Sequence, residues 1–177
     1  MTAEARPAAT STDRFARAIT SACGAGFLPV APGTWGSAVV TAALFAVFAV
    51  RPSLLAGPLA AATLVALALA LGWLGVWAGD RVSAMLGDDD PSEVVIDEVV
   101  GQLLTYALLP VAGRAWTLVS FSVALVAGFL LFRALDIVKP GPIDALQNYH
   151  GGIGIMADDF AAGVVGGCVM LAGAAVL

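Results

Sequence analysis

The sequence predicts an all-α membrane protein, a bundle of about four to five hydrophobic helices with its polar connections on the cytoplasmic face. Hydrophobic residues make up 60% of the 177 residues and charged residues 12%, against about 25% charged in an ordinary soluble domain. Long uncharged runs alternate with short polar segments, as expected for a chain that crosses a bilayer several times. All thirteen carboxylates fall in three stretches, which helical hairpins would bring to one face.

Two membrane helices are expected in the first half of the chain. The first uncharged run has two prolines and two glycines just before Ser37, and these residues disfavour helix. Its helix is therefore expected to begin near Ser37 and to end at Arg51. In the next run, Gly57-Pro58 stands where a helix would begin, since proline is tolerated in a first turn. That run predicts a helix from Leu59 to Gly79.

The second half offers two or three further helices. The uncharged run at 99–113 is short and turns back into the run at 115–132, and the sequence leaves open whether this pair crosses the membrane or only dips into it. The last run covers 160–177. Within it, Gly163 and Gly167 form a GxxxG pattern, and small residues of this kind let helices approach closely. We expect this pattern to pack inside the bundle rather than to form a dimer seam.

Domain organisation and sidedness follow from the distribution of charge. Residues 1–18 are expected to form a flexible, weakly basic tail, and 19–177 one membrane-embedded domain. The chain does not begin with the early apolar core of a secretory signal. If the first run crosses, six basic residues fall on the amino-terminal face and two, Arg51 and Arg114, on the other. An excess of Lys and Arg in short loops marks the cytoplasmic side, so the acidic face is expected to be cytoplasmic.

The first polar segment lies between the second and third runs. Ser92 is expected to cap a helix on which Glu93 and Asp97 share one face. Like charges at that spacing repel unless a cation lies between them. We interpret Asp88–Asp90 as a solvated acidic run. By contrast, Asp97 and Glu98 directly precede an uncharged membrane run, where burial of charge must be compensated, and are therefore candidate site residues.

The second polar segment places Arg133, Asp136 and Lys139 at three-residue spacing before Pro140 ends the helix. One helical face would carry plus, minus and plus as it leaves the membrane. Interfacial anchoring explains the two cations as well as function does. It does not explain a carboxylate at this depth.

The third polar segment runs from His150 through a glycine-rich stretch to Asp158 and Asp159, which would stand at the start of the last helix. Glycines allow tight turns and close approach to a ligand. Adjacent helical residues point about 100° apart, so the two acids cannot both bind one ion from a regular helix, and one of them would instead cap it. A separate turn before the first helix offers the hydroxyls of Thr34 and Ser37 to an anion such as phosphate.

Together these segments predict phosphoryl chemistry at a lipid headgroup. Carboxylates combined with substrate phosphate are the ligands that Mg²⁺ prefers, and lysine and arginine can bind the phosphate oxygens. The cofactor expected from the residues alone is therefore Mg²⁺. The expected partner is a lipid in the bilayer, and no nucleic acid is expected to bind.

Four of these blocks, in the same order, resemble the phosphatidylglycerophosphatase A family of bacterial membrane lipid phosphatases. They are Ala31–Ser37, Ile96–Gly101, Phe132–Arg133 with Asp136 and Lys139-Pro140, and Gly151–Met156 with Asp158-Asp159. The resemblance implies Mg²⁺-dependent hydrolysis of phosphatidylglycerophosphate to phosphatidylglycerol and inorganic phosphate, in the bacterial cytoplasmic membrane. Carried onto this chain, it implies as catalytic residues Asp97, Glu98, Asp136, Lys139, Asp158 and Asp159, with Thr34 and Ser37 as helpers.

The mechanistic hypothesis is metal-assisted hydrolysis. Asp97, Asp136 and Asp159 are the expected ligands of Mg²⁺, which would neutralise the phosphate and lower the pKa of an attacking water. Lys139 would stabilise the equatorial phosphate oxygens.

Two other roles and two alternatives stay open at this point. Glu98 or Asp158 would accept the proton from water, and Arg133 and His150 complete the expected substrate-binding residues, with His150 as a proton donor to the leaving oxygen. Covalent catalysis through an aspartyl phosphate is an alternative that the sequence does not separate from direct hydrolysis. A second functional class is an ion carrier or channel with the acids as a cation site, which the uncharged character of the runs near the bilayer midplane disfavours.

Overall fold

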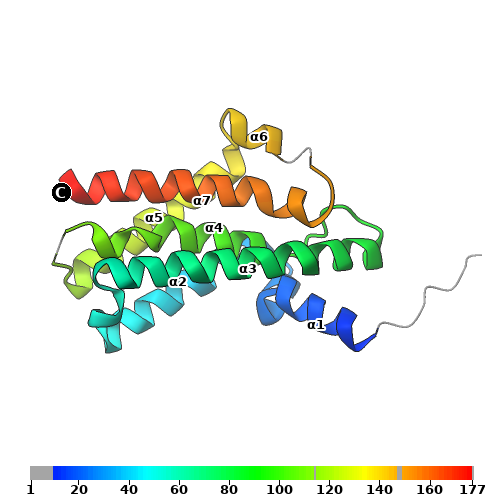
Figure 1. Cartoon of the computed structure of the whole chain (residues 1–177), viewed down its shortest axis with the longest axis horizontal. Coiled ribbons are helices and arrows are strands. Elements are labelled where there is room, and N and C mark those ends of the chain that lie inside the picture. Colours follow the sequence, from blue (N-terminus) through cyan, green and yellow to red (C-terminus); the bar gives the residue numbers. More distant parts are fainter. Residues whose placement is uncertain (1–9, 114, 147–148, 177) are drawn as a thin grey trace, which may run out of the picture.

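The computed structural model describes residues 10–113, 115–146 and 149–176, and every regular element within these ranges is helical (Figure 1). The elements are α1 (Ser11–Thr20), η1 (Ala22–Phe27), α2 (Pro32–Val50), η2 (Pro52–Leu55), α3 (Gly57–Leu86), α4 (Ile96–Ala107), η3 (Leu109–Val111), α5 (Leu118–Val138), α6 (Pro142–Leu146) and α7 (Gly151–Val176). Within the described residues, four helices, α2, α3, α5 and α7, are long and apolar enough to cross a membrane. The expected all-α membrane bundle is confirmed.

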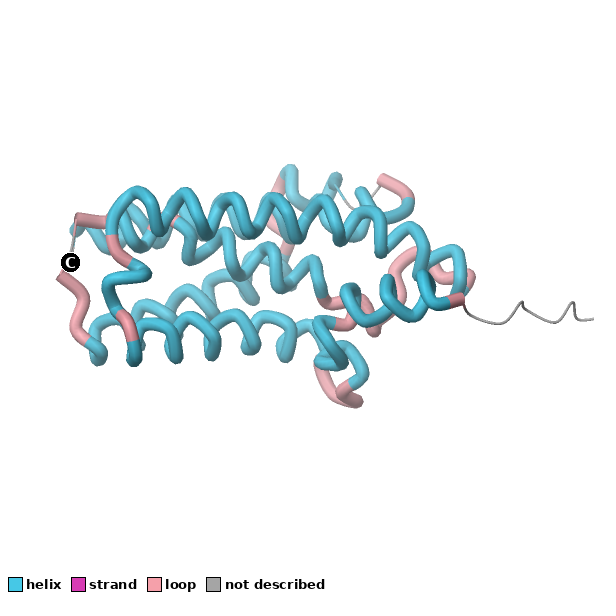
Figure 2. Tube along the Cα trace, turned by 60° about the horizontal axis from the view of Figure 1, so that its bottom comes forward, coloured by secondary structure: helices cyan, strands magenta, loops and turns pink. Residues whose placement is uncertain are grey.

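The long helices lie lengthwise beside one another, and most of their connections collect at the two ends of the bundle (Figure 2). One end, here called the polar end, holds the first residues of α2, α4 and α7 and the last residues of α3 and α5. At the opposite end, here called the far end, Phe48 of α2 stacks on Phe121 of α5 with ring centroids 4.0 Å apart. Helices α2 and α5 therefore run in opposite directions.

Helix α4 forms the centre of the bundle and is buried from Val100 to Ala107. Its twelve residues extend only about 18 Å, which is too short for a bilayer. The chain nevertheless reaches the far end, because Leu109 of η3 lies with Phe121 in the core there. The short run therefore crosses the bundle, with its non-helical part shielded by protein, the setting in which irregular backbone is tolerated at membrane depth.

Small residues bring α7 against α4. A Cβ atom added at Gly163 would overlap the backbone of Gly101, and one at Gly167 would contact the carbonyl of Leu104. The GxxxG pattern thus packs inside the bundle, as expected from the sequence.

The start of α2 differs from the expectation. The helix begins at Pro32 and not near Ser37, because Pro32 occupies the first turn, where its missing N–H costs no hydrogen bond. A Cβ atom at Gly33 would overlap the Glu98 side chain, and one at Gly36 would press on the Val95 carbonyl. These glycines lie within the helix and allow α2 to approach the start of α4.

Two other helices are longer than expected. Helix α3 covers Gly57–Leu86 rather than Leu59–Gly79, and α7 begins at Gly151 rather than at Asp158 and Asp159. Asp158 and Asp159 consequently lie two turns inside α7, so the expectation that one of them caps this helix is wrong. The first turn of α7 is held instead by Asp80 of α3, whose Oδ1 accepts a hydrogen bond from the Gly152 N–H at 2.6 Å.

The expected flexible tail is only partly within the described residues. Residues 1–9 lie outside them, and from Ser11 onward the chain forms α1, which begins with a reciprocal capping box between Thr10 and Asp13. Arg17 of α1 forms an ion pair with Glu93 at 2.6 Å. Residues 11–18 are therefore a packed helix and not a tail.

The expected helix start at Ser92 is also wrong. Helix α4 begins at Ile96, with Val95 at its N-cap and no side-chain capping bond. The Val95 N–H donates to the carbonyl of Thr20 at 2.8 Å, so a long-range contact with the end of α1 fixes where α4 begins. Glu93 precedes the helix and does not share a face with Asp97.

Candidate active site

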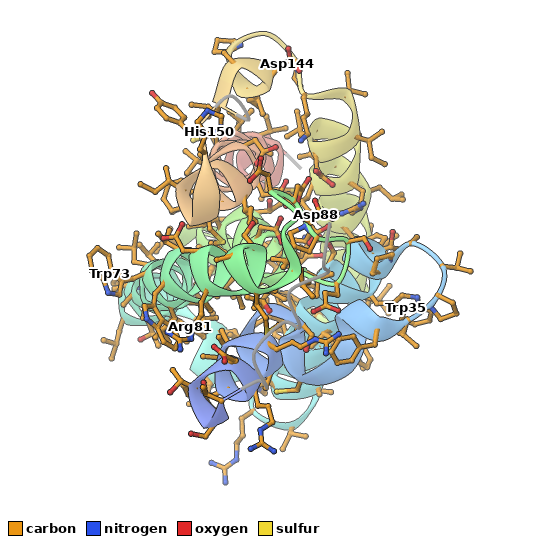
Figure 3. The ribbon with its side chains drawn as sticks, turned by 90° about the vertical axis from the view of Figure 1, so that its right-hand side faces the viewer. Trp35, Trp73, Arg81, Asp88, Asp144 and His150 are labelled. Carbon is orange, nitrogen blue, oxygen red and sulfur yellow. The ribbon has the colours of Figure 1, made fainter. Side chains whose placement is uncertain are left out.

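A cavity of about 520 Å³ opens at the polar end of the bundle. Its walls come from the first turn of α2, the loop before α4, and the polar ends of α4, α5 and α7. Its charged lining residues in the described part of the chain are Asp89, Asp90, Asp97, Glu98, Arg133, Asp136, Lys139, Asp158 and Asp159. Figure 3 looks onto this end, with Asp88 and His150 on the upper, central part and Trp35 and Trp73 pointing outward on opposite sides.

Three carboxylates converge inside the cavity. One oxygen from each of Asp97, Glu98 and Asp159 lies within 4.8 Å of the other two. Asp97 Oδ1 and Glu98 Oε2 are buried, and neither has a hydrogen-bond partner among the described residues. Burial raises the pKa of Asp97, and repulsion from Glu98 and Asp159 raises it further. Such a group of acids needs a proton or a metal cation to offset its mutual repulsion.

Arg133 and Asp136 of α5 stand beside these carboxylates. Arg133 Nη1 lies 2.7 Å from Asp136 Oδ2 and 3.7 Å from Glu98 Oε1, so it links α5 to α4 by charge. Burial also raises the pKa of Glu98, and the positive charge of Arg133 opposes this increase. Asp136 and Asp159 both line the cavity.

Of the three expected metal ligands, Asp97 and Asp159 are therefore brought together, whereas Asp136 adjoins them with Arg133 as its ionic partner. Glu98 takes the third place in the converging group.

Lys139 follows the last residue of α5 and points into the cavity. Its backbone takes the left-handed conformation, with φ of 45°, and its N–H closes the helix by donating to the Leu135 carbonyl. The ammonium group pairs with Asp158. Burial lowers the pKa of Lys139, but the ion pair with Asp158 and the charges of Asp159 and Asp136 together outweigh burial, so the pKa is raised and the charge is retained.

The two neighbouring acids of α7 have different partners. Asp158 meets Lys139, and Asp159 meets the carboxylates of α4, as expected for adjacent residues that point about 100° apart on a helix. A cation bound by Asp159 would thus lie next to a lysine that is available to a phosphate.

The expected phosphate turn contributes backbone and not hydroxyl groups. Pro32 and Gly33 line the cavity, whereas Thr34 and Ser37 do not. The buried Ser37 hydroxyl donates to the Gly33 carbonyl within α2 at 3.3 Å. The earlier start of α2 explains the difference, since a hydroxyl inside a helix can bond to its own preceding turn. The structure therefore does not place either residue at the cavity.

The sequence predicts a different role for two of the other residues at the cavity and does not identify a third that supports its wall. His150 lines the cavity and is exposed. Asp89 and Asp90, which the sequence indicates only as a solvated run, are also exposed and line the cavity. Asp80 was missed, although it holds the first turn of α7, which forms part of the cavity wall. No signal close in the sequence links Asp80 to Gly152.

Gln102 of α4 was also missed. Its side chain is fully buried, and neither its amide nitrogen nor its amide oxygen has a hydrogen-bond partner among the described residues. It follows Glu98 by four residues and therefore shares its helical face. An amide in a mostly apolar run, one turn beyond a predicted site residue, is the signal that could have identified it.

The charge balance of the cavity limits the chemistry that it can support. Among the described residues that line it, seven carboxylates face two basic side chains, so a phosphate monoester would be repelled unless a cation entered as well. Carboxylate oxygens are the ligands of Mg²⁺ in phosphate-binding sites. The first turn of α7 also forms part of the cavity wall, and the N-terminus of a helix favours bound anions. The arrangement suits a metal cation and a phosphate together.

Comparison with known proteins agrees with this chemistry. The model of the family described as phosphatidylglycerophosphatase A matches residues 18–174. A protein of Bacteroides thetaiotaomicron, provisionally named a phosphatidylinositol-3-phosphatase, is 36% identical over 80% of this chain and 82% of its own length. Two proteins named phosphatidylglycerophosphatase A are similar: that of Escherichia coli is 34% identical (80% of this chain, 73% of that protein), and that of Haemophilus influenzae 33% (84% and 82%). No solved structure matches this chain.

Proposed function

Because this chain belongs to the phosphatidylglycerophosphatase A family and is a membrane phosphatase, we propose that it converts phosphatidylglycerophosphate to phosphatidylglycerol and inorganic phosphate. The observation that carries this proposal is the cavity with seven carboxylates and two basic side chains at the end of four apolar helices. The phosphate of a membrane lipid would lie at the same depth in the bilayer as this cavity. An ion carrier, the alternative function, has no support from the relatives, which are named as phosphatases.

Mg²⁺ is the proposed cofactor. The fit is supported by buried oxygens of Asp97 and Glu98 that have no hydrogen-bond partner among the described residues, and by their convergence with Asp159. Oxygens that bind one Mg²⁺ at about 2.1 Å stand up to about 4.2 Å apart, so small rotations would bring the three carboxylates onto one ion. Bound there, Mg²⁺ would neutralise phosphate charge and make a water more acidic.

The basic side chains would bind the phosphate oxygens. Lys139, placed by its ion pair with Asp158, would reach the equatorial oxygens, and Arg133, placed between Glu98 and Asp136, would bind a second side of the group. Both cations already have carboxylate partners, so they would enter the reaction without losing their positions. Preorganised charge of this kind stabilises a transition state without reorganisation during the reaction.

The proposed orientation places the polar end in the cytoplasm. Four basic residues of the described part of the chain lie at the polar end: Arg17 of α1, Arg81 near the end of α3, Arg133 of α5 and Lys139 directly after α5. Arg51 follows α2 at the far end. Excess basic charge marks the cytoplasmic side of a membrane protein. Cysteine substitutions at Ser92 and at Ser53, labelled with an impermeant maleimide in intact and opened spheroplasts, test this orientation. Labelling of the Ser92 site in intact spheroplasts would overturn it.

The activity is tested by measuring phosphate release from lipid in detergent micelles. We expect purified protein to release inorganic phosphate from phosphatidylglycerophosphate with Mg²⁺ and to stop when a chelator is added. Phosphatidylinositol 3-phosphate is the matched second substrate, because one relative is provisionally named for that lipid. No turnover of phosphatidylglycerophosphate by folded, Mg²⁺-supplied protein would refute the proposal. Faster turnover of the inositol lipid would reassign the headgroup.

The same preparation separates direct hydrolysis from covalent catalysis. With substrate labelled in the phosphomonoester group, rapid acid quenching would retain label on the protein only if an aspartyl phosphate forms. Label that resists removal of lipid and is released by hydroxylamine would assign the covalent route.

A further inference from the structure

A second hollow lies on the membrane-facing side of the bundle, between α2 and α5. It has a volume of about 480 Å³ and is almost entirely apolar. Ala38, Ala42 and Phe45 line it from α2, and Val126 and Phe129 line it from α5. Its two hydroxyl groups, of Thr41 and Ser122, already bond to carbonyls of their own helices. We call this hollow the α2–α5 groove.

The α2–α5 groove lies beyond the acidic cavity along the same two helices, and Phe129 shares its face of α5 with Arg133, four residues away. Gly33 of α2 and Arg133 of α5 line the cavity, and Ala38 and Phe129 line the groove. At 1.5 Å per residue, the steps from cavity to groove are about 7.5 Å on α2 and about 6 Å on α5. Because the two helices run in opposite directions, both steps lead away from the polar end and toward the middle of the membrane.

The surroundings of the cavity mouth fit the depth of lipid headgroups. Trp35 of α2 is 48% exposed, and its indole N–H donates to the Val30 carbonyl at 3.1 Å. Tryptophan side chains of this kind are concentrated where membrane meets water. A phospholipid whose phosphate lies in the cavity would then have its acyl chains on the side where the groove begins.

We propose that the α2–α5 groove holds an acyl chain of the same lipid whose phosphate lies in the acidic cavity, and that this lipid enters sideways between α2 and α5. The inference rests on the proposed function and adds to it the place where an acyl chain of the substrate binds and the side from which the lipid enters. The groove has the size of a ligand site, roughly 300–1,000 Å³. Since lipid tails are as apolar as the groove, it acts mainly by aligning the headgroup with Lys139 and Arg133.

The test fills the groove and compares long-chain with short-chain substrate. Ala42→Phe would occupy the groove, and Ala43→Phe is the matched control, because Ala43 is exposed on the same helix and does not line the groove. The substrates are dioleoyl and dibutanoyl phosphatidylglycerophosphate. We expect Ala42→Phe to lower the ratio of kcat/KM for the long-chain over the short-chain lipid at least about tenfold, since misplacement by about 1 Å can cost that much. Ala43→Phe should keep the wild-type ratio.

A second pair of variants approaches the groove from α5. Val126→Phe fills it, whereas Val123→Phe changes an exposed residue outside it. This pair decides the question if Ala42→Phe fails to fold. An unchanged ratio in the folded Ala42→Phe or Val126→Phe protein would overturn the acyl-chain site while leaving the phosphatase proposal intact. No turnover of either lipid by wild-type protein would instead refute the phosphatase proposal itself.

A second copy of the chain could occupy the groove in place of an acyl chain, and the oligomeric state distinguishes the two. Light scattering of each variant in nanodiscs gives the oligomeric state. A change in that state with Ala42→Phe, but not with Ala43→Phe, would identify the groove as a subunit interface and overturn the lipid site. A dioleoyl analogue with a mid-chain photoreactive group should label α2 and α5 in wild-type protein, with labelling reduced by Ala42→Phe.

Discussion

The two ends of the bundle treat buried polar groups in opposite ways. Toward the far end, the buried Tyr106 hydroxyl donates to the Leu125 carbonyl at 2.6 Å and meets the Thr41 hydroxyl at 3.0 Å. At the polar end, buried oxygens of Asp97 and Glu98 and both amide atoms of Gln102 have no hydrogen-bond partner among the described residues. These two environments lie on one twelve-residue helix, α4.

This difference suggests that the far-end part of α4 contributes to stability and its polar-end part to function. A buried hydrogen bond contributes about 1 kcal/mol, whereas a buried polar group without a partner costs about 1–3 kcal/mol. Tyr106 is therefore expected to stabilise the bundle. The acids and the amide at the polar end are expected to lower stability in the unliganded protein, and binding of the proposed Mg²⁺ would offset this cost.

The largest effect is expected for Asp97→Asn. Removal of one charge from the converging carboxylates should lower kcat/KM about a thousandfold, equivalent to about 4 kcal/mol, because the site would lose a ligand for the proposed Mg²⁺. The thermal unfolding midpoint should stay the same or rise, since repulsion with Glu98 and Asp159 is relieved. Asp88→Asn is the control, because Asp88 is exposed and does not line the cavity. Wild-type activity in Asp97→Asn would remove this residue from the site.

Lys139→Met should have the next largest effect, with kcat lowered about a hundredfold through loss of charge at the phosphate. It also leaves Asp158 without its ionic partner, so the unfolding midpoint should fall. The double variant Lys139→Met/Asp158→Asn removes the orphaned charge and should recover stability but not activity. Recovery of both would show that Lys139 acts only by holding Asp158.

Gln102→Leu tests how far the site extends along α4. The apolar side chain removes two buried polar atoms that have no partner, so stability should be unchanged or higher. If Gln102 orients the neighbouring carboxylates, the Mg²⁺ concentration for half-maximal activity should rise about tenfold, the lower range for loss of such a supporting group. Gln102→Glu is a useful comparison, because it adds a fourth carboxylate near the first three. An unchanged Mg²⁺ requirement in Gln102→Leu would place Gln102 outside the site.

The sequence predicted the bundle and the polar end because both depend on local composition. Uncharged runs mark the long helices, and clustered acids mark the end where they meet. The helix starts were predicted poorly for a physical reason: Gly33 and Gly36 suit a turn as well as a close helix contact, and only the position of Glu98 and Val95 across the gap decides between them. Likewise, the cap expected at Ser92 gives way to the bond from Val95 to Thr20, a contact far away in the sequence.

The site was predictable in its residue types but not in its pairing. Asp97, Glu98, Asp136, Lys139, Asp158 and Asp159 all line one cavity. Which oxygens converge depends on the rotation of α4, α5 and α7 about their axes, and this is set by glycine contacts such as Gly163 on Gly101. Sequence spacing alone contains no information on that rotation.

A smaller effect, on stability rather than on activity, is expected toward the far end of the bundle, where the buried hydroxyl has hydrogen-bond partners. Tyr106→Phe removes the hydroxyl that bonds to Leu125 and Thr41 and should lower the free energy of unfolding by about 1–2 kcal/mol. Activity per folded molecule should stay near the wild-type value, because Tyr106 does not line the cavity. Unfolding in detergent with increasing SDS measures the first quantity, and phosphate release at saturating Mg²⁺ the second. A large loss of activity at full stability would contradict the separation along α4.

The smallest effect is expected outside both regions, at the start of α1. Hydrogen bonds from the side chain and backbone of Thr10, together with Arg81, lower the pKa of Asp13. A carboxyl group with a lowered pKa in the folded state stabilises fully above its ordinary pKa of about 4, and this stabilisation disappears as the pH falls through the lowered value. Asp13→Asn should therefore lower the unfolding midpoint by about 1–3 °C at pH 6, and the difference from wild type should shrink as the pH falls below the ordinary pKa of an aspartate.

Arg81→Gln is the matched variant for this last prediction. It removes the ion pair with Asp13 at 2.7 Å but keeps the capping box with Thr10. Since the Thr10 hydrogen bonds are the larger cause of the lowered pKa, Arg81→Gln should shift the midpoint less than Asp13→Asn. Equal shifts that persist at every pH would mean that packing of α1 on α3, and not the charge of Asp13, holds this helix in place.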